Sequence, residues 1–119
     1  MYNNLKGEIY DDFGFYTFCL DKNLTKLPVF IWAVTSYDDD STPKVFVLNS
    51  YSDKRYIDSD LIIFDVNTQK IISNNKKINI INNDINMIKE YIKSHKDLFV
   101  KYWFDKIGIG KFTDMIKVK

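Results

Sequence analysis

The sequence has little cysteine, histidine and arginine, and these shortages exclude several kinds of functional site. Cys19 is the single cysteine and His95 the single histidine among 119 residues. One cysteine excludes an internal disulfide, and no zinc, nucleophile-elbow or dinucleotide pattern is present, so we expect no cofactor. Arg55 is the only arginine, whereas proteins that bind phosphate or read guanine usually use several.

Long hydrophobic runs are also absent. No stretch approaches the ~18 apolar residues of a membrane-spanning helix. The segment Met1–Lys6 lacks the apolar core of a signal peptide. We therefore expect a cytoplasmic protein with no membrane contact. Its wealth of Ile, Asn, Lys and Tyr is typical of a low-GC bacterial genome.

Charge of one sign does not dominate the chain. Lys and Arg number 17 and Asp and Glu 16, a net charge of +1. A charge this small gives no whole-molecule attraction to nucleic acid, which is disfavoured as a partner. Residues 1–60 carry 6 basic and 10 acidic side chains (net −4), and residues 61–119 carry 11 and 6 (net +5). This asymmetry is a weak indication of a binding surface in the second half.

Apolar residues are plentiful, at 45%, and predict one folded domain over residues 1–119. Most of the first two-thirds is typical of strands, because β-branched and aromatic residues alternate between turn formers. Residues 1–12 form an arm or a short strand in this interpretation. The segments that predict strands are 13–20, 28–37, 44–51, 61–66 and 77–81.

A single long helix is predicted from about residue 83 to about residue 106. Asn83 or Asp84 is a good N-cap, and Gly108 is a natural stop. Between them, apolar residues recur at spacings of three and four. They are Ile85, Ile88, Ile92, His95, Phe99 and Tyr102. The predicted fold is α+β: an antiparallel sheet of four to six strands within about residues 13–81, followed by this helix packed on it. Residues 111–119 are a short helix or an extended segment.

The predicted helix has two different edges. Its apolar face is widened by Met87, Tyr91, Leu98 and Trp103. Lysines occupy the other edge. Tyr and Trp are enriched at partner interfaces, and lysines can meet an acidic partner, although both are also common on ordinary helix surfaces. Glu90 with Lys93, and Asp97 with Lys101, are spaced to pair. The candidate interaction residues are Lys89, Lys93, Lys96, Tyr91 and Trp103.

Other candidate sites have simpler interpretations. Asp38–Asp40 could supply oxygens to a metal, but the ligand spacing of a calcium loop does not follow, so a solvated hairpin tip is favoured. His95 falls on the apolar face of the helix and is interpreted as a core residue. A catalytic pair with Cys19 is disfavoured, because nothing in the sequence places the two together. We predict no metal site.

Two function hypotheses follow. The 19 Phe, Tyr and Trp residues exceed what a core of this size usually needs, so some are predicted at an interface unless an N-terminal arm covers the second sheet face. The first hypothesis is a non-enzymatic protein-interaction module of bacterial or phage origin, with a protein partner or as a homodimer. The alternative is a small ribonuclease-like toxin that acts through Lys54, Arg55 and Tyr56, where cations and an aromatic ring would flank a phosphate.

The second half also resembles a family of small uncharacterised bacterial domains. That family runs from a Pro-Pro-His-Phe-His-Val type strand, through an Asp-containing hairpin, to a C-terminal helix ending in Trp. The matching stretches are Thr42–Val47, Ile63–Thr68 and Ile88–Trp103, within about residues 28–106. Lys44 and Phe46 replace the two histidines of the family, so no role of those histidines carries over. The resemblance implies a sheet-plus-helix domain, sometimes encoded beside toxin–antitoxin-like partners, without an established activity.

Overall fold

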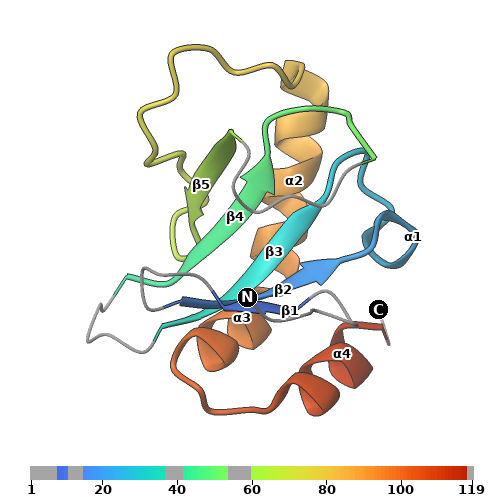
Figure 1. The fold of residues 1–119 in the computed structure, drawn as a ribbon, viewed down its shortest axis with the longest axis vertical. Helices are drawn as coiled ribbons and strands as arrows, with labels where there is room; N and C mark the ends of the chain where they lie inside the picture. Colours follow the sequence, from blue (N-terminus) through green and yellow to red (C-terminus); the bar gives the residue numbers. More distant parts are fainter. Residues whose placement is uncertain (1–7, 11–14, 37–41, 54–59, 118–119) are drawn as a thin grey trace.

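The computed structural model of this chain describes residues 8–10, 15–36, 42–53 and 60–117. Within these ranges, five strands form one antiparallel sheet in the order β1-β2-β3-β4-β5, so each strand pairs with its neighbour in sequence. Helices lie against it, and the predicted α+β class is confirmed (Figure 1). The strands are β1 (Glu8–Tyr10), β2 (Phe15–Leu20), β3 (Ile31–Ser36), β4 (Lys44–Leu48) and β5 (Leu61–Asp65).

The predicted strand at 77–81 is wrong. After β5, the chain turns at an aspartate: Asp65 Oδ1 accepts the N–H of Asn67 at 2.8 Å. A single bridge then joins Ile71 to Phe64, and residues 77–81 form no strand. The side chains of Ser73 and Asn75, beyond the bridge, bond to the open edge of β5 instead.

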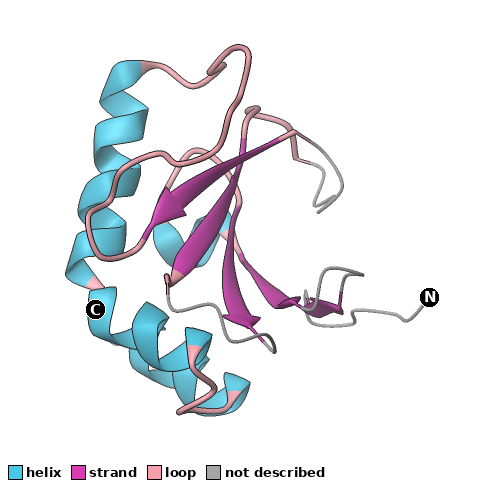
Figure 2. Cartoon of the chain, turned by 90° about the vertical axis from the view of Figure 1, so that its left-hand side faces the viewer, coloured by secondary structure: helices cyan, strands magenta, loops and turns pink. Residues whose placement is uncertain are grey.

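The described residues form four helices, where one long helix was predicted. They are α1 (Lys22–Thr25), α2 (Asn82–Ser94), α3 (Lys96–Trp103) and α4 (Ile109–Lys117). Figure 2 shows α2, α3 and α4 gathered on one side of the sheet. The single helix over about 83–106 is therefore wrong, because it is two helices that meet at His95. The helical alternative for the tail is confirmed as far as residue 117, and α1 was not predicted.

The break at His95 is caused by two polar side chains that bond backward. Ser94 Oγ donates to the Glu90 carbonyl at 2.7 Å, and the His95 ring Nδ1 lies 2.8 Å from the Tyr91 carbonyl. Such bonds compete with the backbone ladder and bend helices. His95 itself leaves the helical conformation, with φ −115° and ψ 22°. The apolar spacing continues across this break, which is why periodicity predicted one helix.

The end of α3 is set by Asp105 and not by Gly108. Asp105 has a left-handed φ of 57°. Its N–H donates to the Tyr102 carbonyl at 3.1 Å, and the N–H of Lys106 donates to the Lys101 carbonyl at 2.7 Å. These two bonds are the Schellman motif, which usually places glycine at the left-handed position. Gly108 precedes α4 instead.

The core has one layer on each face of the sheet. On the helix side, Ile85, Ile88, Ile92, Phe99 and Tyr102 are buried, which confirms the predicted apolar face. They pack on residues of alternate strand positions, as side chains of a strand point to opposite faces. The second face carries a separate buried cluster that contains Cys19, Phe30, Trp32, Val34, Phe46, Leu48 and Trp103.

Candidate functional site

The outward side of α2 carries an open depression of about 410 Å³. Most of the surface area that lines it is apolar, although polar residues contribute too, and Met87 is 46% exposed there. Leu27, just after α1, closes one side. A helix surface of this kind is wide enough to receive an apolar side chain from another molecule. The lining residues are Leu27, Asn83, Asn86, Met87, Glu90, Tyr91 and Ser94.

Tyr91 forms the inner wall of this depression. Its ring stacks on His95, with centroids 4.2 Å apart, and meets the edge of Phe99 at 6.3 Å. The hydroxyl is buried and has no hydrogen-bond partner among the described residues. Burial raises the pKa of Tyr91 to about 12, because the phenolate would lose its hydration. The ring is thus held by packing alone, without help from its polar end.

A second depression of about 290 Å³ lies at the α2–α3 junction and shares Ser94 with the first. Met115 of α4, 41% exposed, forms its far side. Phe112 holds α4 in place, with its ring centroid 5.8 Å from Phe99 and 4.9 Å from Tyr102. The two depressions together are called the Ser94 surface below. The junction residues are Lys93, Ser94, His95, Lys96, Asp97, Leu98 and Met115.

The predicted interaction residues divide between this surface and the interior. Tyr91, Lys93 and Lys96 line the Ser94 surface. Lys89 is half-buried and lines neither depression. Trp103 is completely buried in the second core cluster, with the Lys44 ammonium 4.9 Å above its ring. Its place among the candidate interaction residues is wrong, because the buried side chain presents no surface to a partner.

The charged side chains of the Ser94 surface are not paired with one another. Within the described ranges, the ion pair found joins Lys22 to Asp53, so the predicted Glu90–Lys93 pair is not formed. Two acidic and two basic side chains therefore stand at this surface without an intramolecular salt bridge to a described residue. They are Glu90, Lys93, Lys96 and Asp97.

A larger depression, about 560 Å³, belongs to an asparagine network beside β5. Asn49 is buried and donates to Asp60 Oδ2 at 2.7 Å and to the Lys77 carbonyl at 2.8 Å. Its own oxygen accepts the N–H of Asn79 at 2.7 Å. Asn75 donates to Asp60 Oδ1 at 2.8 Å. These groups satisfy one another, so the network ties the chain after β5 to the sheet.

The network also closes the free edge of β5. Ser73 Oγ accepts the N–H of Ile63 at 3.0 Å, and Asn75 Nδ2 donates to the Leu61 carbonyl at 2.9 Å. Side chains thereby occupy two positions at which another strand would pair. This edge is not available for strand addition along those positions.

Tyr51 fixes the beginning of α2. The N-cap position is Ile81, whose side chain cannot accept a hydrogen bond. Tyr51 Oη accepts the Ile81 N–H at 3.1 Å and donates to Asp84 Oδ2 at 2.7 Å. The Ile81 N–H lowers the pKa of Tyr51, but desolvation and the bond to Asp84 outweigh it, so that pKa is raised. Tyr51, distant in sequence, thus satisfies a free N–H group at the start of α2, as a capping side chain does in other helices.

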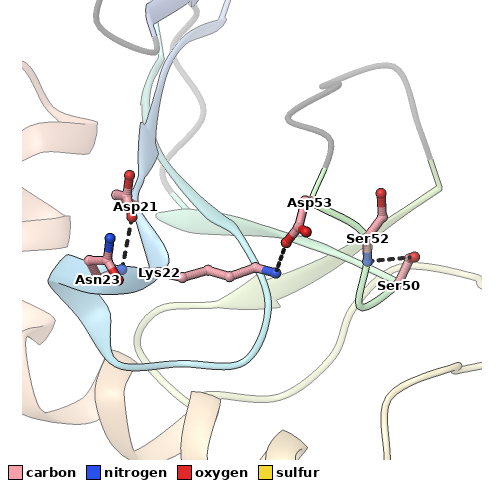
Figure 3. Close-up of polar contacts among 6 residues, drawn as sticks. All are labelled: Asp21, Lys22, Asn23, Ser50, Ser52 and Asp53. Atoms are coloured by element: carbon pink, nitrogen blue, oxygen red, sulfur yellow. Dashed lines mark hydrogen bonds and ion pairs between the residues drawn. The ribbon is translucent and has the colours of Figure 1, made fainter.

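Asp53, which directly precedes the residues of the ribonuclease-like hypothesis, lies next to α1. Figure 3 shows Lys22 extending from α1 to this aspartate, with Nζ 3.0 Å from Oδ1. Nearby, the Asp21 carboxylate accepts the N–H of Asn23 at 2.8 Å and so caps α1. Asp53 is 96% exposed, so its pair with Lys22 contributes little to stability. The residues of the toxin hypothesis, Lys54, Arg55 and Tyr56, lie outside the described residues, and that hypothesis stays a prediction.

The remaining candidates gather into no chemical site in the described part of the chain. Cys19 and His95 belong to opposite faces of the sheet, Cys19 with Trp32 and His95 between the helices. No group of three His, Cys, Asp or Glu side chains in the described ranges could hold a metal ion. Asp38–Asp40 lie outside those ranges. None of the described helices combines the length and the apolar character that crossing a bilayer requires.

Sequence reasoning missed Leu27, Met115 and Asn49. Leu27 and Met115 join the Ser94 surface only through tertiary contacts, although the spacing of Phe112 and Ile116 could have oriented α4. Nothing local to Asn49 indicates its network. Comparisons with protein-family models, with curated proteins and with solved structures found no match. The resemblance to the family of small bacterial domains therefore stays a prediction.

Proposed function

We propose that this protein is a cytoplasmic, non-enzymatic protein-interaction module of bacterial or phage origin that binds its partner through the Ser94 surface. The observation that carries the proposal is the meeting of two depressions at Ser94. Between them they combine exposed apolar side chains with charged groups that have no salt bridge to a described residue. Apolar side chains are typical of the centre of a protein interface, and charged groups are typical of its rim.

The apolar part of the surface suits an interface because it is adaptable. Met87 lines one depression and Met115 lines the other, and both are more than two-fifths exposed. Methionine is unbranched and polarisable, so it fits partner surfaces of varied shape. Tyr91 offers a rigid aromatic wall in the depression that Met87 lines, and few rotamers are lost when such a ring is covered. Binding there would remove exposed apolar area from water.

A photocrosslinking experiment tests this proposal. p-Benzoylphenylalanine is placed at Met87 and, as the matched control, at Ile72, which is 43% exposed beyond β5. Each protein is irradiated in cells of the organism that encodes it. We expect discrete crosslinked products from position 87 and none from position 72, because only the first lies on the Ser94 surface.

Products of equal yield from both positions, or none from either, would contradict the proposal. Circular dichroism of each labelled protein checks that folding is intact. Both sites are exposed, so both variants should melt close to the unsubstituted protein.

A further inference from the structure

We propose that Met87 and Met115 are reversible oxidation sites, at which a peroxide converts the two thioethers to sulfoxides and so prevents the Ser94 surface from binding its partner. This inference rests on the proposed function and adds the regulation of the same surface. The oxidant is a peroxide by chemical class, and methionine sulfoxide reductases reverse the change.

The exposed sulfur-containing side chains of the described residues are found at this surface. The chain has one cysteine and three methionines. Cys19 is only 6% exposed, within the second core cluster. Met87 and Met115 are 46% and 41% exposed, and Met1 lies outside the described residues. Because oxidation requires contact between the sulfur and the oxidant, a peroxide in solution reaches Met87 and Met115 far more readily than Cys19.

The two methionines divide the surface between them. Met87 comes from α2 and lines the first depression, whereas Met115 comes from α4 and lines the depression at the α2–α3 junction. Each depression therefore contains one oxidisable side chain. Oxidation of both methionines changes both parts of the Ser94 surface at once.

The reaction is an oxygen-atom transfer. The thioether sulfur attacks one oxygen of hydrogen peroxide, so that the O–O bond breaks and an S–O bond forms. The sulfur gives up two electrons, and the other oxygen leaves as water after it takes the proton of the transferred oxygen. In the reverse reaction, a dithiol supplies two electrons and two protons, and the sulfoxide oxygen leaves as water.

The sulfoxide opposes binding because it places a polar oxygen on a side chain that the partner must cover. A polar group buried without a hydrogen bond costs free energy, and most of the area that lines the Met87 depression is apolar. The fold is affected much less, because both side chains are already more than two-fifths exposed and changes at such positions usually alter stability little. Oxidation thus acts on binding and preserves the fold.

Peptide mass mapping tests whether the two sites react in the folded protein. The protein is treated with hydrogen peroxide at neutral pH, with and without urea, and then digested. We expect Met87 and Met115 each to gain one oxygen atom almost as fast without urea as with it, whereas Cys19 reacts only in urea. Methionine sulfoxide reductases A and B with a dithiol should remove both oxygens. Circular dichroism should show that the oxidised protein keeps its fold.

Photocrosslinking then measures the effect on binding. p-Benzoylphenylalanine is placed at Asn86, an exposed residue that lines the Met87 depression, so both methionines stay in the chain. Reduced, oxidised and reductase-treated samples are irradiated in desalted extract of the source cells. We expect oxidation to lower the yield of crosslinked product about tenfold or more, and the reductase treatment to restore it.

Met1→Leu, prepared by cleavage of an N-terminal fusion, is the matched control. Met87 and Met115 are then the only methionines of the chain, and the same reversible loss of crosslinking should follow. A loss that is absent from Met1→Leu would assign the effect to residue 1 and overturn the proposal.

Equal yields from the reduced and oxidised proteins, or a loss that the reductases do not reverse, would overturn it as well. So would methionines that resist peroxide until urea is added, or an oxidised protein that has lost its fold. All of these results leave the proposed function standing. No crosslinked product from the reduced protein would instead contradict the proposed function, and the oxidation switch with it.

Discussion

Tyr51, which contacts the start of α2, and Tyr91, which belongs to α2, use their hydroxyl groups in opposite ways. Tyr51 Oη links the Ile81 N–H to the Asp84 carboxylate and so completes the first turn of the helix. Tyr91 Oη is buried without a hydrogen-bond partner among the described residues. A buried hydroxyl that bonds nothing costs free energy, whereas a capping hydroxyl contributes it. The same chemical change at the two positions should therefore have different effects.

Tyr91→Phe should leave the free energy of unfolding at neutral pH unchanged or raise it by up to about 1 kcal/mol, because it removes an unsatisfied polar group and keeps the ring. Urea denaturation of the variant and the wild type measures this. Tyr51→Phe is the control, and it should lower stability because the cap is lost. A clear loss of stability in Tyr91→Phe would show that its hydroxyl has a partner in the folded protein.

The same variant makes a prediction about alkaline pH. The pKa of Tyr91 rises from 10.0 to about 12 in the folded protein, so the unfolded chain loses this proton first. The contribution of the protonated Tyr91 hydroxyl to the free energy of unfolding is fully present below pH 10. It falls as the pH rises toward 12. Tyr91→Phe should therefore lose less stability than the wild type over that interval. Equal slopes for the two proteins would contradict the burial of this hydroxyl.

Helix ends decide how the C-terminal half is arranged. The stop after α3 depends on Asp105, which holds a left-handed conformation that favours glycine. The turn it makes lets α4 return and place Met115 at the Ser94 surface. Glycine at this position should fit the same Schellman geometry with less steric cost.

Asp105→Gly should thus stabilise the protein by up to about 1 kcal/mol, after its greater freedom in the unfolded chain is allowed for. This corresponds to a rise in Tm of about 3–6 °C for a domain of this size. Asp105→Val removes the same charge but adds a β-branched side chain, and it should lower the Tm. Calorimetry of both variants checks the sign. A valine variant that melts with the wild type would mean that residue 105 is not left-handed.

Sequence patterns predicted these elements where local forces decide them. The apolar spacing from Ile85 to Tyr102 identified the buried helix face, and β-branched runs located the strands. The break at His95 was missed because a single non-helical residue hardly disturbs that spacing. The false strand at 77–81 has another cause: its backbone is bound by Asn49, which is 28 residues before Lys77, and no local pattern encodes such a contact.

The prediction of a helix with one apolar edge and one lysine edge identified part of the candidate site. It named Tyr91, Lys93 and Lys96, which the fold brings to one surface. It also named Trp103, whose burial depends on how α3 meets the sheet. The contribution of Leu27 and Met115 required the positions of α1 and α4. A surface assembled from three parts of the chain is visible only after these parts have packed.

The methyl NMR signals of methionine report directly whether the Ser94 surface binds protein. The chain has three methionines, and Met87 and Met115 both lie on this surface. Signals are assigned with Met87→Leu and Met115→Leu, and spectra are recorded against protein concentration and in extract of the source cells. We predict that the Met87 and Met115 signals shift or broaden together in at least one series. If the Met87 and Met115 signals both stay unchanged in the concentration series and in the extract, binding of protein at this surface is contradicted.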